Sequence, residues 1–339
     1  MTAAVLRRTP APSGLRPVDS RRDLAGLADV MEAAFGDRLD ESGARMVTAM
    51  RAFGRWGWLG WAAGHLFLPP AAYPAGFVWI EDGRLVGNAS LMRADLGSRR
   101  WVLINVAVSP KWRRKGIART LVQACLDQAR RLGAEEVLLQ VDADNRGAQD
   151  LYESLGFVRT TIRSTWGRQI ASTFGAVDGP AARPGRPEDM PAQLALARRL
   201  CPEGLSWPRP LDGLEFRLSV PWGRTAHWVW PMEGAIRGFL ATFPGYESPG
   251  VHALLVVEPE VSGQAEGPLL DAALNHIPPR YGEIQVETLD ETGADALRLR
   301  GFQRERRLAW MIARLAASVT VAAGARWESG AEGSERRSV

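Results

Sequence analysis

Residues 106–119, VAVSPKWRRKGIAR, contain the pattern that decides the fold. An apolar run over Trp101–Val108 is followed by a basic turn with Gly116, and an amphipathic helix is expected over residues 117–132. At the start of such a helix the free backbone N–H groups converge, and the helix dipole adds partial positive charge. This arrangement suits a phosphate or pyrophosphate, and Gly116 lets the ligand approach the backbone closely.

Two common phosphate-binding motifs do not describe this stretch. It lacks the Gly-Lys-Ser/Thr ending of a Walker A loop and the three spaced glycines of the dinucleotide fingerprint. A plain basic turn on a solvated surface is the alternative interpretation. The apolar strand before the turn and the helix after it favour an anion site over that alternative.

A second pattern lies at residues 145–157, NRGAQDLYESLGF. With Arg113, Gly116 and Ala118 it resembles the two signatures of the GNAT superfamily of N-acetyltransferases, Q/R-x-x-G-x-G/A and N-x-x-A-x-x-L-Y-x-x-x-G-F. The resemblance covers the first half of the chain well and the second half weakly. It implies the acyl-CoA N-acyltransferase (GNAT) fold, an α/β arrangement around a mixed sheet. It also implies acetyl-CoA as cosubstrate, with no metal ion.

The resemblance also implies roles for individual residues. The central strand is expected to carry a bulge and to splay from its neighbour, so that the backbone of Val106, Ala107 and Val108 pairs with pantetheine. Asn145 is expected to contact the pantetheine arm, and Tyr152 to lie near the coenzyme sulfur. The pyrophosphate is expected at the N–H groups of the turn and helix start, with the implied binding residues being Arg113, Arg114, Lys115, Gly116, Ile117, Ala118 and Arg119.

Acetyl transfer gives Tyr152 a chemical reason to be in this place. An amine attacks the thioester and a thiolate leaves, and a thiol of pKa about 8.5 leaves more easily when a proton arrives with it. A phenol of pKa about 10 is a suitable general acid when it lies within hydrogen-bond distance. The alternative role for Tyr152 is that of a packing aromatic on a short helix.

The general base is not assigned by the sequence. In the ribosomal-protein N-terminal acetyltransferases, which this stretch also resembles, a glutamate on the strand before the asparagine is the base, and here that position is Gln140. Glutamine cannot take a proton. Asp95, Glu81 or Asp82 acting through water are alternatives, as are an ordered water relay and an amine that arrives neutral.

The second half of the chain repeats features of the first, which predicts two tandem copies of the fold. Arg16-Pro17 recurs as Arg183-Pro184, Asp82-Gly83 as Glu233-Gly234, and Val108-Ser109-Pro110 as Val257-Glu258-Pro259. An offset of 145 residues pairs Gly156-Phe157 with Gly301-Phe302 and Gln140-Val141 with Gln285-Val286. The expected boundaries are 1–172 for the acetyl-CoA-binding copy, 182–318 for a degenerate copy and 326–339 for a disordered tail, with a Pro/Gly-rich linker near residues 179–191.

The second copy lacks the coenzyme signals. Tyr152 corresponds to Leu297 and Asn145 to Asp290, and residues 261–268, which follow Val257-Glu258-Pro259, contain Glu266 and Pro268 but no arginine or lysine. Glu266 would repel phosphate, and proline removes a backbone donor. We therefore expect that this half does not bind acetyl-CoA. Its expected roles are structural support, a wall of the substrate site or a dimer surface.

Composition excludes several classes of protein. A net charge of +4 over 339 residues gives no argument for nucleic-acid binding, and two cysteines give no disulfide framework or cysteine-rich metal site. The Trp-rich segment 56–79 contains prolines and a histidine, which argues against a membrane span and leaves burial or an acceptor pocket as its expected roles. We expect a cytoplasmic protein.

These observations favour an acetyl-CoA-dependent N-acetyltransferase that moves an acetyl group to the amine of a small molecule or peptide by direct attack in a ternary complex. The alternative is a non-catalytic acyl-CoA-binding regulatory protein, for which the missing base would be meaningful. A structural protein with two decayed copies is disfavoured by the retention of Arg113, Gly116, Asn145 and Tyr152. The acceptor and the oligomeric state, including a homodimer, are left open by the sequence.

Overall fold

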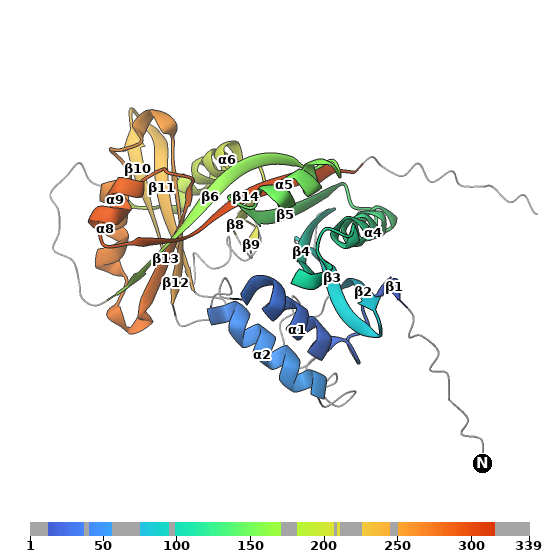
Figure 1. The fold of residues 1–339 in the computed structure, drawn as a ribbon. Coiled ribbons are helices and arrows are strands. Elements are labelled where there is room, and N and C mark those ends of the chain that lie inside the picture. The colour runs from blue at the N-terminus through green and yellow to red at the C-terminus, as the bar shows by residue number, and fades with distance from the viewer. Residues whose placement is uncertain are drawn as a thin grey trace, which may run out of the picture.

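The computed structural model describes residues 13–36, 41–55, 75–94, 99–170, 182–206, 209–210, 226–244 and 250–315. The expected tail and most of the Trp-rich segment lie outside the described residues, as does Asp95. Both halves contain helices and strands (Figure 1). In the first half they are β1 (Gly14–Pro17), α1 (Leu24–Phe35), α2 (Glu41–Arg55), β2 (Ala75–Glu81), β3 (Arg84–Arg93), β4 (Arg100–Val108), α4 (Ile117–Arg131), β5 (Glu136–Asp142), α5 (Arg146–Glu153) and β6 (Val158–Gln169).

The second half follows a similar order, with the helix α6 and the short strands β8 and β9 between β7 and β10. Its elements are β7 (Arg183–Pro184), α6 (Met190–Leu200), β8 (Leu205–Ser206), β9 (Arg209–Pro210), β10 (His227–Met232), β11 (Ala235–Pro244), β12 (Val251–Val257), α8 (Glu266–His276), β13 (Glu283–Leu289), α9 (Ala294–Leu299) and β14 (Gln303–Arg314). Short 3-10 helices follow β4 at Pro110–Trp112 and β12 at Pro259–Val261. The tandem repeat predicted from the sequence is therefore confirmed at the level of the elements.

Local details recur between the two halves at the repeated sequence positions. In the β2–β3 turn Asp82 and Gly83 have φ of 49° and 73°, and in the β10–β11 turn Glu233 and Gly234 have φ of 52° and 78°. Positive φ at both central residues matches the twist of a two-residue hairpin. The repeated arginines also behave alike, since Arg16 pairs with Asp23 through two hydrogen bonds of 2.6 and 2.7 Å, and Arg183 with Asp189 through two of 2.6 and 2.8 Å.

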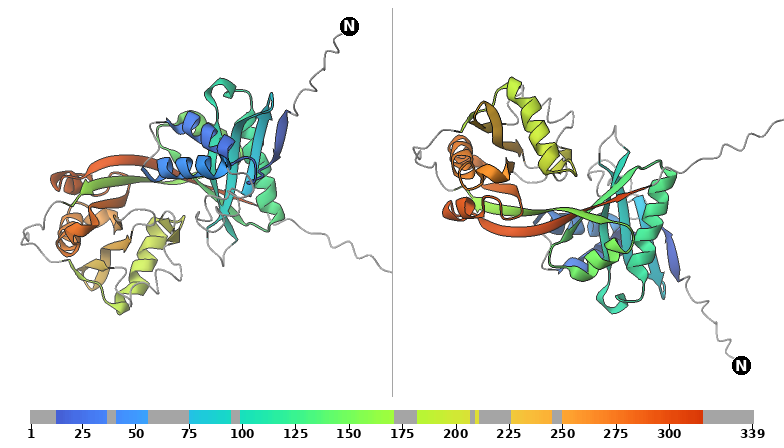
Figure 2. Two further views of the ribbon diagram at one scale, coloured as in Figure 1. Left: turned by 90° about the horizontal axis from the view of Figure 1, so that it is seen from below. Right: turned by 90° about the horizontal axis from the view of Figure 1, so that it is seen from above.

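A single twelve-stranded sheet joins the two halves, in the order β1-β2-β3-β4-β5-β14-β6-β13-β12-β11-β10-β7. The final strands are exchanged, because β14 of the second half pairs with β5 of the first, and β6 of the first half pairs with β13 of the second. Strands β6 and β14 also pair with each other, and Figure 2 shows them side by side between the two lobes. Each half thus completes its sheet with a strand from the other.

Helices cover both faces of the first half's strands. Leu121, Cys125 and Leu126 of α4 are buried against one face, together with Ala309 and Met311 of the exchanged strand β14. Leu24, Leu27 and Met31 of α1 pack with α2 against the other face. Burying an apolar stripe of each helix against the sheet is the main stabilising contribution in such layered folds.

Part of the region expected as a linker forms regular elements. In it β7, a 3-10 helix and the start of α6 follow one another over residues 183–190, and Asp189 accepts hydrogen bonds from Arg183 and from the amide of Arg186. In the first half, helix α1 begins after Asp23. The buried Asp23 carboxylate binds Arg16 and the Asp19 amide, which holds the preceding residues in a turn.

Candidate active site

The central strands β4 and β5 are parallel and separate soon after they begin. They pair only over residues 100–102 and 136–138. On its other edge β4 pairs with β3, but the register shifts so that two residues, Asn105 and Val106, lie opposite Ala89 alone. Asn105 has a φ of 54°, so β4 is bulged there. Beyond the bulge, the edge of Val106, Ala107 and Val108 that faces β5 borders a cleft instead of a strand.

The start of α4 forms the end wall of this cleft. The first hydrogen bond of the helix in this part of the structure runs from Thr120 N to Gly116 O. The N–H groups of Ile117, Ala118 and Arg119 precede it and are therefore available to a ligand. Gly116 has a φ of 80°, and Arg114 a φ of 64°, which is uncommon for a residue with a side chain. This backbone turns the loop so that its amides border the cleft.

Several basic side chains of the loop bind the protein itself. Arg113 donates to Val108 O at 3.1 Å and to Ala34 O at 3.2 Å, which fixes the loop against β4 and α1. Arg119 donates to Ser154 Oγ at 2.8 Å, and the Lys115 ammonium lies 4.2 Å from the centre of the Trp112 ring. These contacts engage several of the basic side chains within the protein, so the donors that border the cleft here are mainly backbone amides.

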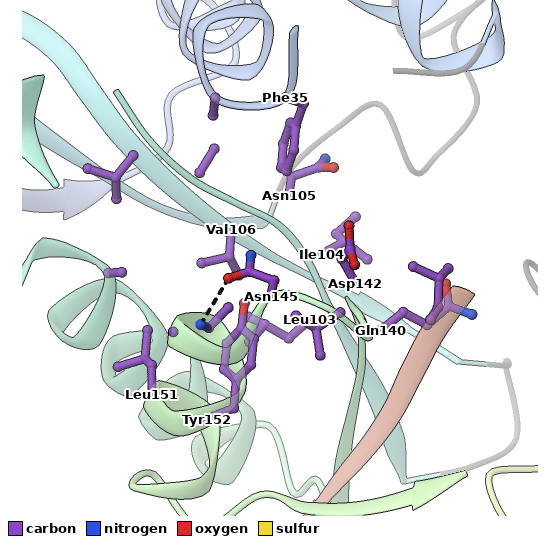
Figure 3. A pocket seen from close by; sticks show the side chains of 18 of the residues that line it. Phe35, Leu103, Ile104, Asn105, Val106, Gln140, Asp142, Asn145, Leu151 and Tyr152 are labelled. Atoms are coloured by element: carbon purple, nitrogen blue, oxygen red, sulfur yellow. Dashed lines mark hydrogen bonds between the residues drawn. The ribbon is translucent and has the colours of Figure 1, made fainter. Parts of the chain in front are cut away.

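Asn145 and Tyr152 come from α5 on the same side of the cleft (Figure 3). Asn145 is the N-cap of α5, and its side chain accepts a hydrogen bond of 3.2 Å from Ala148 N. Tyr152 is 6% exposed and packs edge-on against Phe157, with ring centroids 5.8 Å apart. In Figure 3 its hydroxyl end is directed toward β4, on the side of Leu103 and Val106. Burial raises the pKa of Tyr152 above that of an ordinary tyrosine, so its proton is retained.

The cleft has a volume of about 1990 Å³ and is lined by both halves of the chain. Gln140 and Asp142 lie on one face of β5, and Phe35 lines the cleft at the end of α1. The second half contributes residues that the sequence analysis did not assign to the site. They come from β13 and β14 and are Glu283, Gln285, Arg304, Glu305, Arg306, Arg307 and Leu308. The sequence analysis named a substrate wall as one role of the second half, but it identified no residues for that role.

The three carboxylates named as alternatives for the general base do not gather at this cleft. Glu81 accepts a 2.9 Å hydrogen bond from Trp79 Nε1, and Asp82 forms the β2–β3 turn; neither lines the cleft. Asp95 lies outside the described residues. In the described residues no cluster of metal ligands is found, and none of the described helices is long and apolar enough to cross a membrane.

The equivalent place in the second half is closed. Strands β12 and β13 pair over 251–255 and 284–288, without the early separation seen in the first half. Glu266 is fully buried, and its carboxylate accepts from Ser262 Oγ and from Gly263 N, both at 2.7 Å. A side-chain carboxylate therefore occupies one backbone N–H and one hydroxyl at the place where an anion would bind.

Comparison with known proteins agrees with this geometry. The profile of the Acetyltransferase (GNAT) family matches residues 45–157. N-alpha-acetyltransferase 30 of Schizosaccharomyces pombe is 35% identical over 86 residues, which is 24% of this chain and 57% of that protein. The [ribosomal protein bS18]-alanine N-acetyltransferase of Escherichia coli is 41% identical over 64 residues, 19% of this chain and 43% of that protein. The chain thus spans about half the length of these curated relatives.

A solved structure extends the comparison to both halves. The GCN5-related N-acetyltransferase from Sphaerobacter thermophilus aligns with a TM-score of 0.56 over 88% of this chain and 95% of that one, at 16% identity. At this identity the likeness concerns the fold. The first half of the chain, which carries the signatures at 113–118 and 145–157, is thus similar to GNAT acetyltransferases, and the two halves repeat one topology.

Proposed function

We propose that the protein is an N-acetyltransferase that moves an acetyl group from acetyl-CoA to an amine in the cleft of its first half. The observation that supports this most directly is the joint presence of the β4 bulge, the splayed edge of Val106–Val108 and the amides at the start of α4 around one cleft. The closed counterpart in the second half argues for a single coenzyme site per chain.

The residues around the cleft fit acetyl-CoA. The amides that follow Gly116 would hold the pyrophosphate, and no atom lies within 4 Å of a Cβ built at Gly116, so a ligand can approach the backbone there. The exposed edge of Val106, Ala107 and Val108 would pair with the pantetheine amides. The amide group of Asn145 has its oxygen engaged as the α5 cap, which leaves its N–H donors for the pantetheine arm.

Acetyl-CoA supplies a thioester carbonyl for attack by an amine in a ternary complex. The amine nitrogen bonds to the acetyl carbon, the carbon–sulfur bond breaks, and the Tyr152 hydroxyl gives its proton to the departing sulfur. The amine loses its proton to water in the cleft, and water returns a proton to Tyr152. Because burial keeps Tyr152 protonated, its acid form is present when the sulfur departs.

The test measures free thiol released from acetyl-CoA over a panel of amines. Tyr152→Phe removes the hydroxyl and keeps the ring against Phe157, so we expect kcat to fall by about 10²–10⁴ while coenzyme affinity is unchanged. Glu153→Gln, on the same helix but not lining the cleft, is the matched control. Unchanged kcat in Tyr152→Phe would contradict the acid role.

The alternative proposal is an acyl-CoA-binding regulatory protein. Gln140 favours it, since this side chain in the cleft cannot act as a base. Equilibrium binding of acetyl-CoA with no thiol release for any amine would support this function over acetyl transfer.

A further inference from the structure

The second half places the carboxylate of Glu305 in the cleft of the first half. Against β6, the register of β14 shifts so that Arg304 lies opposite Trp166 and Arg306 opposite Thr165, which leaves Glu305 as the extra residue of a bulge. The Glu305 carboxylate lies over Gly167, where any Cβ would collide with it. Gln285 Nε2 donates to Glu305 Oε2 at 3.1 Å.

Two neighbouring arginines are engaged with other carboxylates. Arg304 beside Glu305 pairs with Glu291, and Arg307 binds Asp290 through two hydrogen bonds of 2.7 and 2.9 Å. Within the described part of the chain no arginine or lysine forms an ion pair with Glu305. Arg306 also lines this wall, and burial lowers its pKa.

A second carboxylate adds to the negative potential. Glu283 of β13 lines the same cleft. Partial burial, and then the like charge of Glu283, raise the pKa of Glu305 above the usual value for a glutamate. A positive group beside Glu305 would relieve this repulsion, whereas an anion would increase it.

We propose that Glu305, with Glu283 beside it, binds a positively charged group of the acceptor, so that the acceptor is an amine carrying a second cationic group. This inference rests on the proposed acetyl transfer in the same cleft. The reacting nitrogen must be neutral to attack the thioester, so the charge held at Glu305 belongs to another group of the same molecule. The exchange of β14 is what brings this residue to the cleft.

The test compares straight-chain diamines with monoamines of matched length as acceptors. At best spacing we expect the diamine to have a kcat/KM about 5-fold above that of the monoamine, the size of a favourable exposed ion pair. Glu305→Gln should abolish this preference through KM, Glu305→Lys should reverse it, and Glu305→Asp should retain part of it. Glu260→Gln, on an exposed residue away from the cleft, should leave it unchanged.

A binding measurement separates this inference from the proposed reaction. Calorimetric titration of the same diamines and monoamines into the CoA-bound full chain should show the same preference and its loss in Glu305→Gln. Tyr152→Phe should leave it intact. If no amine causes thiol release, the proposed acetyl transfer is wrong. The titration then still shows whether Glu305 binds a cationic group of the amine. Equal affinity for diamine and monoamine, or a preference that persists in Glu305→Gln, overturns the inference.

Discussion

At the scale of single residues, Tyr152 connects packing to chemistry. Its ring fills the core beside Phe157, and this burial raises the pKa of its hydroxyl. The contact with Phe157 is therefore compatible both with a purely packing role of Tyr152 and with a role as general acid. Only the direction of the hydroxyl end, toward β4 and the cleft, distinguishes the two, and this direction favours the acid (Figure 3).

The raised pKa of Tyr152 predicts the pH dependence of the reaction. A group whose pKa is raised keeps its proton to higher pH, so loss of the acid form should begin above the ordinary tyrosine value of about 10. We expect kcat/KM to rise as the amine deprotonates, without a fall up to about pH 10. Thiol release corrected for spontaneous thioester hydrolysis measures this. A fall in rate below pH 9 that is absent in Tyr152→Phe would contradict it.

At the scale of elements, the N-termini of α4 and α8 differ in what their hydrogen-bond donors face. The start of α4 exposes its amides to a cleft, and the start of α8 is preceded by a loop whose donors bind Glu266. Glu258, which follows β12 before α8, is buried and pairs with Arg199 and Arg237. Carboxylates of the chain itself thus stabilise the second loop.

Replacing Glu266 tests this interpretation. Glu266→Ala leaves Ser262 Oγ and Gly263 N without their acceptor, so we expect a loss of about 1–3 kcal/mol in the free energy of unfolding. We expect no second coenzyme site, because β12 and β13 remain paired. Denaturant unfolding and the stoichiometry of acetyl-CoA binding measure the two effects. A stoichiometry of two coenzymes per chain would show that Glu266 alone closes the second site.

At the scale of the whole molecule, strand exchange makes the halves depend on each other. Ala309, Met311 and Ala313 of β14 belong to the core of the first half. Buried contacts also cross between the halves, since Glu203, after α6, accepts hydrogen bonds of 2.7 Å from Thr160 Oγ1 and 2.8 Å from Arg163 on β6. Both partners of the Arg163–Glu203 ion pair are almost completely buried.

The first half should therefore not fold stably when it is separated from the second half. Residues 1–172 alone lack β14, so the edge of β5 and part of the core are exposed. We expect this fragment to associate or to lack a cooperative unfolding transition, and co-expression with residues 182–318 to restore a one-to-one complex. Light scattering and denaturant unfolding measure this. A stable monomer of 1–172 with the coenzyme affinity of the full chain would contradict the expectation.

The local structures and the tandem repeat of the two halves could be predicted from the amino-acid sequence alone. Helix α4 was expected over 117–132 and is found at Ile117–Arg131, followed by Gly133 with a φ of 75°. The short helix around Tyr152 is α5, Arg146–Glu153, followed by Gly156 with a φ of 90°. Such features follow from residues close in the chain, so periodicity and glycine position are sufficient to find them.

Strand pairing, and with it the set of side chains that reach the cleft, could be seen in the tertiary structure but not in the sequence. Strands β6 and β14 occupy repeated positions with similar patterns, and no local signal says which of them pairs with β5. The binding of Arg113 to Val108 O, the closure of the second loop by Glu266 and the arrival of Glu305 from a distant strand all follow from that choice. The physical reason is that strand pairing joins residues far apart in sequence, and its free energy depends on the packing of the whole sheet.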